Sequence, residues 1–518
     1  MERHPVKEAA AGTVAHGPAG RLRALWEEHP LAAVMGLAAL VRLVAALLSA
    51  GYRAYDDHYN VIEVAQSWAD GHWDLTQEGV VLRSLVYPWL HFALFKGLQG
   101  LGVDDPQAKM LVVRLLHGAW SLLTVWFGYR AAAALAGERR ARLAGLLLAV
   151  FWIQPFMSVR NMIEAVCQPL LVGAAWLLVR GGAEARERRG WNAFAAGLLL
   201  GLAFVIRFQT LVIAGATGLV LLAQRRWRDG FLLGGGTAIA ASVVQGGSDW
   251  IGFGKPFASV LAYYAYNANP YNLAGYPKSP WFMYLLLLAG VLIPPTSLML
   301  LQGVARTWRS AAVLFWPALA FFAFHSAYPG KQERFLLPIV PAVLVLAALG
   351  WHELAERSAF WARRPRLAGG LWAWFWVVNG LLLAVMTTTY GKRSAIESLS
   401  WLHGRPDLRG VVWETSEVNP VPLPIFYLRR DVPVYDLTAS RTVESLRAEI
   451  AARRAPPNYV VMLGTDRLEE RLRRLGPLLP GLALQRTITP SLHDWVLHRL
   501  NPTNNVNLTA YVYRVGSQ

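Results

Sequence analysis

Long apolar runs recur along this chain and constrain its fold more than any other feature. A helix needs roughly 20 mostly apolar residues to cross the hydrocarbon core of a bilayer. Several runs are shorter than that, so we expect two or three of them to be broken or re-entrant. The pattern predicts a mainly α, polytopic membrane bundle with about 11 spans. The runs lie near residues 31–50, 110–133, 141–157, 163–179, 192–208, 210–223, 230–246, 281–301, 311–325, 335–351 and 369–388.

The composition excludes an ordinary soluble enzyme. Of the 518 residues, 55% are hydrophobic and only 16% are charged, which is too little charge to cover a soluble chain of this length. The net charge of +17 lies mostly in short loops between apolar runs, so we expect no nucleic-acid partner. The single cysteine, Cys167, allows neither an intrachain disulfide nor a cysteine metal cluster.

Basic residues cluster in alternate loops and predict the orientation of the bundle. The positive-inside rule assigns such loops to the cytoplasm, and the loops between them are richer in Asp and Glu. We therefore expect a cytoplasmic N-terminal segment, residues 1–28, a transmembrane domain, residues 29–390, and a long outer loop, residues 51–108. The first 25 residues lack an apolar stretch, so the first span itself is expected to be the targeting signal. Arginines crowd around 21–23, 139–142, 180–189, 225–228, 306–309 and 357–366.

Two segments are not predicted to span the membrane. The outer loop has a helical pattern at 58–69 and an amphipathic stretch at 85–101, which predicts a helix lying in the interface plane. In residues 391–518, short β-rich runs alternate with helical patterns, which predicts a small soluble α/β domain. An odd number of spans places this domain on the outer face. Its expected strands are 410–413, 432–435, 459–463, 483–488 and 509–514, and its expected helices are 440–452 and 465–475.

Two adjacent carboxylates, Asp56 and Asp57, directly follow the first span. Charged residues at the edge of a span are costly and therefore point to a function. Three explanations are open: Asp57 caps the next helix, a carboxylate removes a proton from a hydroxyl of a lipid-borne substrate, or the pair holds a divalent cation. Glu63, Glu78 and Arg83 follow in the same loop.

Basic residues on the otherwise acidic outer face are the second signal. The loop that begins at His325 carries Lys331, Glu333 and Arg334, against the orientation rule. Contact with lipid head groups is one explanation, and a pocket for an anionic group, most naturally a phosphate, is the other. Further polar residues at the outer ends of spans are Arg160, Glu164, Arg207 and Asp249, of which Arg160 and Glu164 could simply pair at i,i+4 spacing.

In their order and spacing, these motifs resemble glycosyltransferase family 22, the polyprenyl-phosphate-mannose-dependent mannosyltransferases of the glycosyltransferase C superfamily. The resemblance covers about residues 50–340, and Asp57 stands where the family usually has a glutamate. It rests on Asp56-Asp57-His58-Tyr59-Asn60-Val61-Ile62-Glu63, Arg83-Ser84-Leu85-Val86-Tyr87-Pro88, Arg160-Asn161 with Glu164, Asp249 to Phe257 with Asn267, and His325 to Phe335.

The resemblance implies an inverting glycosyltransferase of the glycosyltransferase C fold, with its site on the outer face. Asp56, with Asp57 beside it, would deprotonate a hydroxyl of a lipid-linked or glycan acceptor. The sugar would be mannose, carried by a polyprenyl phosphate, and no cofactor would be required, although a divalent cation could bind at Asp56 and Asp57. Donor phosphate would be bound by Lys331, Arg334, His325 and Arg207, and the acceptor or sugar would be bound, or the site supported, by Glu63, Glu78, Arg83, Arg160, Glu164, Asp249 and Glu333.

Two other functions stay open at this point. A lipid-carrier transporter or flippase would need functional charges toward both faces, whereas the cytoplasmic loops here hold mostly arginines. A transferase of the same superfamily that modifies lipid A or protein hydroxyls would also carry an acidic pair after its first span. The Ala- and Arg-rich, Lys-poor composition suggests a bacterial source, and hence an inner membrane.

Overall fold

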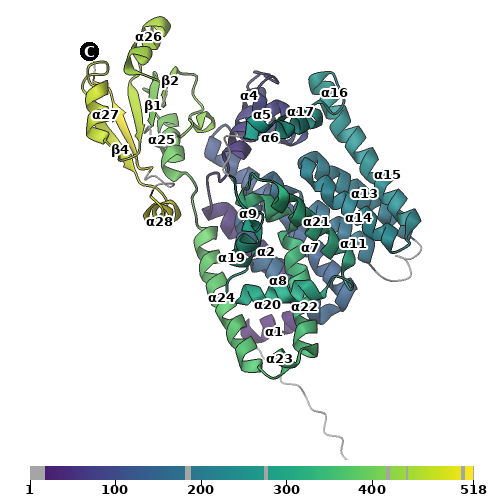
Figure 1. Cartoon of the computed structure of the whole chain (residues 1–518). Coiled ribbons are helices and arrows are strands. Elements are labelled where there is room, and N and C mark those ends of the chain that lie inside the picture. Colours follow the sequence, from purple (N-terminus) through teal and green to yellow (C-terminus); the bar gives the residue numbers. More distant parts are fainter. Residues whose placement is uncertain are drawn as a thin grey trace, which may run out of the picture.

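The chain forms a helical bundle that carries a smaller, sheet-containing unit above one side (Figure 1). The computed structural model describes residues 18–180, 188–273, 278–415, 421–438, 441–502 and 508–516. Of the predicted N-terminal segment, residues 1–17 lie outside the described residues, and the remainder forms the helix α1 (Pro18–Glu28). The fold class predicted from the sequence, a mainly α membrane bundle with a small C-terminal α/β unit, is confirmed.

Within the described residues, five helices are long and apolar enough to cross a membrane. The predicted run 281–301 is not one straight helix, because α19 (Met283–Val291) and α20 (Thr296–Arg306) are bent by 110° at a short break. One broken run is therefore present among the described residues, while the expectation of two or three and the total of about 11 spans stay predictions. The five helices are α2 (Pro30–Leu48), α7 (Pro106–Ala136), α13 (Arg189–Ile206), the continuous η4 and α22 (Glu333–Arg357), and α24 (Pro365–Thr387).

Shorter helices complete the bundle. Three of them are apolar, namely α10 with α11 (Ile163–Val179), η2 with α14 (Phe208–Ala223), and α21 (Ala312–Ala327). Helices of this length are at or below the shortest length that crosses the hydrocarbon core of a bilayer. The others are α8 (Glu138–Val150), α9 (Ile153–Ser158), α15 (Trp227–Ala240), η3 (Ala241–Gly246), α16 (Gly247–Phe253), α17 (Ala258–Ala268), α18 (Pro270–Leu273) and α23 (Ala359–Ala362).

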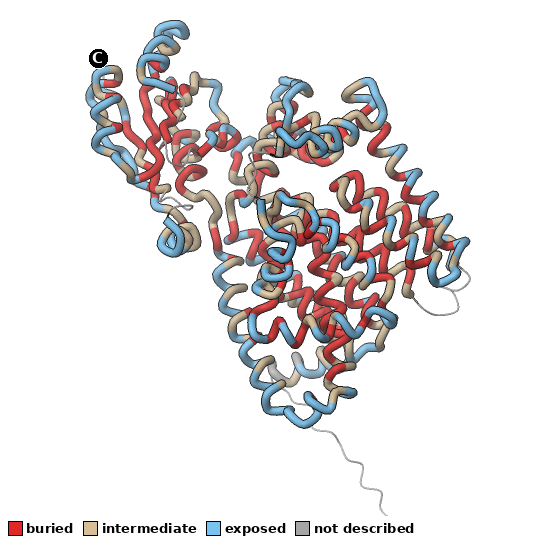
Figure 2. Tube along the Cα trace, viewed as in Figure 1, coloured by how far each residue is buried: buried red, intermediate tan, exposed pale blue. Residues whose placement is uncertain are grey.

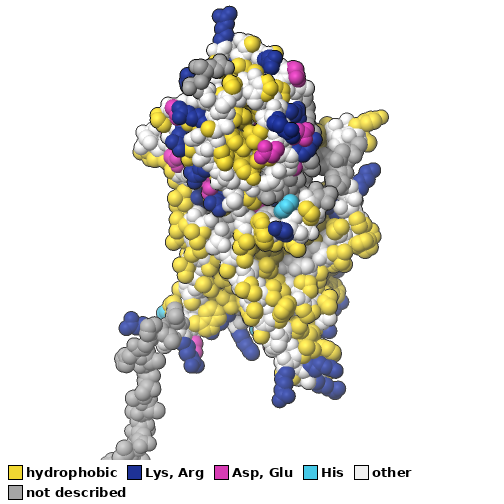
Figure 3. All heavy atoms as spheres, turned by 90° about the vertical axis from the view of Figure 1, so that its left-hand side faces the viewer, with side chains coloured by type: hydrophobic (Ala, Val, Ile, Leu, Met, Phe, Trp, Pro, Cys, Tyr) yellow, Lys and Arg dark blue, Asp and Glu magenta, His cyan; other side chains and the backbone are white. Residues whose placement is uncertain are grey.

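Burial differs sharply between the central and the outer helices (Figure 2). In the segment formed by η4 and α22, 83% of an apolar 18-residue stretch is buried, whereas in α24 the share is 11%. A helix that is apolar all round and still exposed must face lipid rather than water. The space-filling view shows the matching surface, a broad hydrophobic band below the C-terminal unit with Lys and Arg gathered at its lower end (Figure 3). The chain is therefore an integral membrane protein.

The outer loop is helical over most of its length. The predicted helix at 58–69 is confirmed and consists of a π-helical turn, η1 (His58–Glu63), followed by α4 (Val64–Ala69). The predicted amphipathic helix at 85–101 is also confirmed as α6 (Val86–Gly100). Two short helices, α3 (Tyr55–Asp57) and α5 (Glu78–Val81), carry acidic residues of the loop.

The C-terminal unit is a five-stranded sheet in the order β2-β1-β3-β5-β4. The three strands β1, β2 and β3 are parallel, with Val411 opposite both Val434 and Tyr459, and β5 is antiparallel to β3 and β4. All five predicted strands and both predicted helices are present. The elements are α25 (Arg393–His403), β1 (Val411–Thr415), η5 (Ile425–Tyr427), β2 (Val434–Leu437), α26 (Val443–Arg453), β3 (Tyr459–Leu463), α27 (Leu468–Leu475), β4 (Ala483–Ile488), α28 (Leu492–Leu500) and β5 (Ala510–Arg514).

The C-terminal unit packs directly on the outer loop. The ring of His58 lies between Tyr52, at 4.3 Å, and Tyr427 of η5, at 5.4 Å, with both pairs stacked. Arg429 forms ion pairs with Asp70 and Asp104 of the loop, at 2.6 and 2.5 Å. Aromatic stacking and multiple charge-assisted hydrogen bonds fix the position of η1, which directly follows the acidic pair.

Candidate active site

The acidic pair lies on α3, a single turn of helix that follows α2 in the chain. The backbone of Ala54 is extended and starts this turn, so Asp56 and Asp57 both occupy the first turn of the short helix. Carboxylates are favoured there because the free N–H groups of a helix start are partly positive. Asp57 is buried, whereas the Asp56 side chain is 43% exposed. The two neighbours therefore differ in access to substrate.

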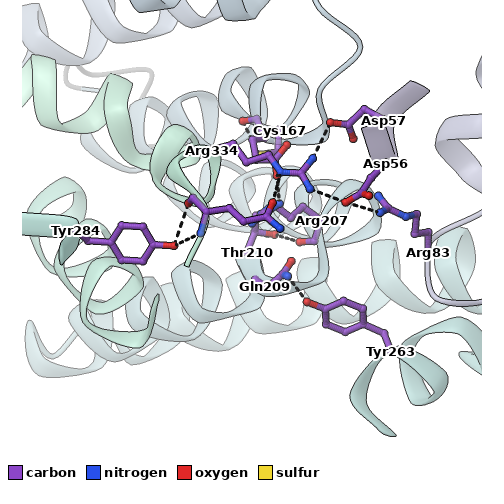
Figure 4. Close-up of polar contacts among 12 residues, drawn as sticks. Asp56, Asp57, Arg83, Cys167, Arg207, Gln209, Thr210, Tyr263, Tyr284 and Arg334 are labelled. Atoms are coloured by element: carbon purple, nitrogen blue, oxygen red, sulfur yellow. Dashed lines mark hydrogen bonds and ion pairs between the residues drawn. The ribbon is translucent and has the colours of Figure 1, made fainter. Parts of the chain in front are cut away.

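Arg334 links the two carboxylates from the opposite side of the site (Figure 4). Its Nη2 donates to Oδ2 of Asp56 at 2.6 Å, and its Nη1 donates to Oδ2 of Asp57 at 2.9 Å. Arg83 adds a second ion pair to Asp56 at 3.2 Å. Arg334 is the second residue of η4 and is 278 residues from Asp56, so the fold brings the predicted acidic and basic segments into direct contact.

A second, more deeply buried pair lies behind Arg334. Glu164 of α10 forms an ion pair with Arg207, which stands in extended conformation at the end of α13, and the Nε of Arg334 is 3.8 Å from the same carboxylate. Arg207 Nε and Nη2 are buried and have no hydrogen-bond partner among the described residues. Unsatisfied buried donors of a cation are costly, so this guanidinium is suited to an anionic ligand.

The charges in the site shift the pKa values of the two acids in opposite directions. Burial alone would raise the pKa of Asp56, but the guanidinium groups of Arg83 and Arg334 lower it below the usual value of an aspartate. Burial and the nearby carboxylate of Glu164 raise the pKa of Asp57 to about 7, against the opposing charge of Arg334. Asp56 is therefore ionised at neutral pH, while Asp57 exchanges its proton there.

Lys331 and His325 lie near this cluster but do not contact the acids. Lys331 donates to the backbone carbonyl of Tyr328, and its Nζ is 5.6 Å from the centre of the Tyr284 ring. His325 is buried, with its ring 6.0 Å from that of Phe335. The same Phe335 ring lies 5.1 Å from the Arg207 guanidinium, so His325 is separated from Arg207 by one aromatic side chain.

We call the group of Asp56, Asp57, Glu164, Arg83, Arg207 and Arg334 the acid–arginine cluster. Three predicted supporting residues lie outside it. Glu63 points to the C-terminal unit, where it accepts a hydrogen bond from the backbone N–H of Phe426 at 3.3 Å. Glu78 is exposed on α5. Asp249 is fully buried at a separate place in the bundle. There its Oδ2 accepts hydrogen bonds from the N–H and the hydroxyl of Ser259 at 2.9 and 2.8 Å.

Arg160 and Glu333 also make no direct contact with Asp56 or Asp57 in the part of the chain that the structure describes. The alternative that Arg160 pairs with Glu164 is wrong, because Arg160 donates instead to the backbone carbonyls of Ala50 and Gly51 at 3.1 and 2.6 Å. Those two carbonyls follow the end of α2, so Arg160 holds the start of the outer loop in place. Glu333 is exposed beside Arg334 and lines an apolar pocket.

Several site residues were not among those predicted. Gln332 accepts from the Nε of Arg334 at 2.8 Å, and its own backbone lies against the hydroxyl of Tyr284, which donates to the Gln332 carbonyl at 3.0 Å. Gln209 donates to the hydroxyl of Tyr263. Neutral side chains do not stand out by charge in a sequence. The only indication for Gln209 and Gln332 was that each lies two residues from an arginine of the site, Arg207 or Arg334.

The described residues contain no group of three or more His, Cys, Asp and Glu side chains arranged to hold a metal ion. The guanidinium of Arg334 lies between Asp56 and Asp57, in the position that a bridging cation would need. In this structure Asp56 and Asp57 therefore already share a positively charged partner, and a divalent cation at this pair stays a prediction.

Comparison with known proteins decides the family. A model of the Alg9-like mannosyltransferase family matches residues 34–409, which include the acidic pair, Arg207 and Arg334. The chain belongs to the Alg9-like mannosyltransferase family. Its family and its named relatives indicate a mannosyltransferase, which favours the enzyme over the transporter alternative.

Individual relatives of this Alg9-like chain are distant but similar over most of their length. GPI mannosyltransferase 3 of Yarrowia lipolytica is 23% identical, over 78% of this chain and 76% of the relative. Mannosyltransferase APTG1 of Arabidopsis thaliana is 22% identical, over 83% and 84%. The crystal structure of ArnT from Cupriavidus metallidurans bound to undecaprenyl phosphate superposes with a TM-score of 0.59 at 15% identity, over 96% of this chain and 100% of ArnT. That similarity shows a shared fold.

Proposed function

We propose that this protein transfers a mannosyl group, with inversion, from a polyprenyl-phosphate carrier to a hydroxyl of a lipid-linked or glycan acceptor. The observation that carries the proposal is the direct contact of Arg334 with Asp56 and Asp57, which joins a carboxylate base to a cationic site. ArnT, which shares the fold, binds undecaprenyl phosphate, and relatives in sequence are mannosyltransferases.

Asp56 is the base in the proposed reaction. It is the exposed member of the acidic pair, and its lowered pKa keeps it ionised. The acceptor oxygen bonds to the anomeric carbon from the face opposite the phosphate, while the bond from that carbon to the phosphate oxygen breaks. The acceptor proton moves to Asp56, and the electron pair of the broken bond leaves with the phosphate. No general acid is needed, because a phosphate is a stable leaving group.

The arginines stabilise the leaving phosphate. Three carboxylates and three guanidinium groups balance in the site when all are ionised. An added phosphate therefore favours the protonated form of Asp57, whose pKa of about 7 makes that proton available. The unpartnered Nε and Nη2 of Arg207 then supply preorganised donors to the departing charge, which is the most effective form of electrostatic catalysis.

The isoprenoid chain is proposed to lie in an apolar pocket beside Arg334. The pocket is formed between α9, α19 and the start of α22, and most of its lining is aliphatic. The charged residues of the lining are Arg53, Glu333 and Arg334. A mostly aliphatic pocket whose lining includes two arginines, one of them Arg334 of the site, matches a lipid phosphate. We also propose that the site lies on the non-cytoplasmic face of a bacterial inner membrane, with a cytoplasmic N-terminus.

Replacing Asp56 by Asn tests the proposed base. Asn keeps the size of the side chain but cannot accept the proton, so we expect transfer from polyprenyl-phosphate mannose to fall by at least ~100-fold. The measurement is mannose transfer by purified protein in lipid nanodiscs. The wild-type protein is also measured in excess chelator, where we expect its rate to be unchanged.

The matched control is Asp431→Asn, which makes the same chemical change at an exposed position of the C-terminal unit. It should transfer at the wild-type rate. Near-normal transfer by the Asp56 variant, with normal thermal unfolding of both proteins, would remove Asp56 from its role.

A further inference from the structure

The helix α28 of the C-terminal unit presents its apolar side chains outward. Leu492, Trp495, Val496 and Leu500 are 69%, 45%, 38% and 77% exposed, and they share one helix face through their i, i+3, i+4 and i+8 spacing. Arg499 lies on the same face, with its guanidinium 5.3 Å from the Trp495 ring. None of the residues of α28 is buried.

The opposite face of α28 is polar and is turned to the protein. Its half-buried residues are His493, Asp494 and His498, with Leu497 as the one apolar member. A helix that packs on a domain in water turns its apolar face to the domain and its polar face to solvent. The reverse arrangement in α28 indicates that its outer face meets a medium that is itself apolar.

The place of α28 in the fold supplies that medium. Burial alone would raise the pKa of Asp494, but hydrogen bonds from His493 and Ser491 and the positive charge of Lys392 lower it, so the start of α28 lies close to Lys392. Lys392 follows the end of α24 at Thr387 by only five residues. In Figure 1, α28 lies below the sheet, at the height of the upper end of α24.

The neighbouring surface of α24 faces lipid. Its side chains Val377, Leu381 and Val385 are exposed, and they lead upward toward the level of α28. Figure 3 shows this hydrophobic band continuing to the base of the C-terminal unit. The apolar face of α28 is therefore an extension of the lipid-facing surface of the bundle at the boundary where tryptophan and arginine side chains are favoured.

We propose that α28 is an interfacial anchor that inserts Leu492, Trp495, Val496 and Leu500 into the membrane leaflet at the outer end of α24. Arg499 extends from the same face to the lipid phosphates, as long basic side chains do at an interface. Since the C-terminal unit also packs on η1, the anchor fixes this unit at two places, on the outer loop and on the membrane.

Lipid quenching of a label at position 496 tests the anchor. The full chain has one cysteine, Cys167, which is buried, so a Val496→Cys variant can be labelled selectively with an environment-sensitive fluorophore. In phosphatidylcholine nanodiscs that contain doxyl-labelled lipid, we expect several-fold stronger quenching by the lipid than by aqueous iodide. The matched control is Ala451→Cys, an exposed position on α26 at the far end of the sheet, where we expect the opposite preference.

Two outcomes would overturn the proposal. Quenching by iodide at position 496 as strong as at position 451 would place α28 in water, and protection from both quenchers would show that protein covers it. A Leu492→Asp, Leu500→Asp background changes only exposed side chains, so the protein should still fold. In that background the label at position 496 is expected to lose its lipid quenching, and retention of it would equally contradict an anchor made by these side chains.

Discussion

At the scale of single residues, the site depends on one arginine, Arg334, that contacts more than one acid. Arg334 contacts Asp56 and Asp57 through different nitrogens and approaches Glu164 with a third. The planar, forked guanidinium makes such contacts with fixed geometry, which a lysine cannot do. Removing one charge from this cluster therefore leaves others uncompensated, and this makes paired substitutions informative.

Arg207→Gln is expected to lower stability and transfer together. The variant removes the close ion-pair partner of buried Glu164 and leaves only Arg334 Nε at 3.8 Å, so we expect a cost of up to about 3–5 kcal/mol of unfolding free energy. The double variant Glu164→Gln, Arg207→Gln removes both charges and should regain most of that stability. It should still transfer at least ~100-fold more slowly, because the phosphate has lost its donors. Thermal unfolding and mannose transfer separate the two effects, and a double variant with wild-type transfer would contradict the phosphate role.

Asp57 should make stability depend on pH near neutrality. Its folded-state pKa of about 7 lies above the unfolded value, so the folded state binds the proton more tightly. This contribution to stability is complete below the unfolded pKa and is lost as the pH rises through about 7. We expect the unfolding temperature of the wild type, relative to Asp57→Asn, to fall between pH 5 and pH 8. A difference that is constant or rises over this range would contradict the raised pKa.

At the scale of elements, close packing of α13 against α15 positions Arg207, which directly follows α13. The backbones approach at glycines, since a Cβ on Gly236 of α15 would lie 2.3 Å from the carbonyl oxygen of Phe194, and one on Gly197 would lie 2.1 Å from that of Leu233. Small residues allow such contacts between helices in membranes, where packing rather than the hydrophobic effect holds helices together.

Gly236→Ala should therefore force α13 and α15 apart. Backbone atoms cannot turn aside as a side chain can, so we expect a loss of about 1–3 kcal/mol in unfolding free energy, as for other overpacked sites, together with slower transfer. Gly235→Ala is the control on the same helix, because nothing lies within 4 Å of its added Cβ. That variant should be neutral or slightly stabilising, and equal destabilisation of both would show that the contact is unimportant.

At the scale of the whole molecule, charge and apolar surface are arranged along one axis. The hydrophobic band lies above a lower end rich in Lys and Arg (Figure 3), and the outer loop and the sheet are at the upper end (Figure 1). If the basic end is cytoplasmic, as the positive-inside rule predicts, the acid–arginine cluster and the C-terminal unit lie together on the other side.

Cysteine labelling of intact cells tests this orientation. Asp431→Cys in the C-terminal unit and Arg228→Cys in the first turn of α15 both introduce an exposed thiol, while native Cys167 is buried. We expect a membrane-impermeant maleimide to label position 431 before lysis and position 228 only after it. The reverse pattern would place the proposed site in the cytoplasm and would exclude the proposed orientation.

Local properties of the sequence were sufficient for the architecture. Apolar runs define membrane helices because hydrocarbon requires every backbone hydrogen bond to be made within the segment. Alternation of β-rich and helical stretches in the last 128 residues was likewise enough to predict the strands, from Val411–Thr415 to Ala510–Arg514. The acidic pair after the first span and the basic loop at Lys331 and Arg334 were visible because charge is rare in such a chain.

Only the tertiary structure decided which of these charges meet. Arg334 reaches Asp56 across 278 residues, whereas Lys331, from the same loop, turns to Tyr328 and Tyr284. Arg160 binds backbone carbonyls rather than Glu164, which instead pairs with Arg207. A sequence specifies the chemistry of each side chain and the conformation of its neighbours, but contacts between distant helices follow from how their surfaces pack, and packing depends on the whole set of side chains at once.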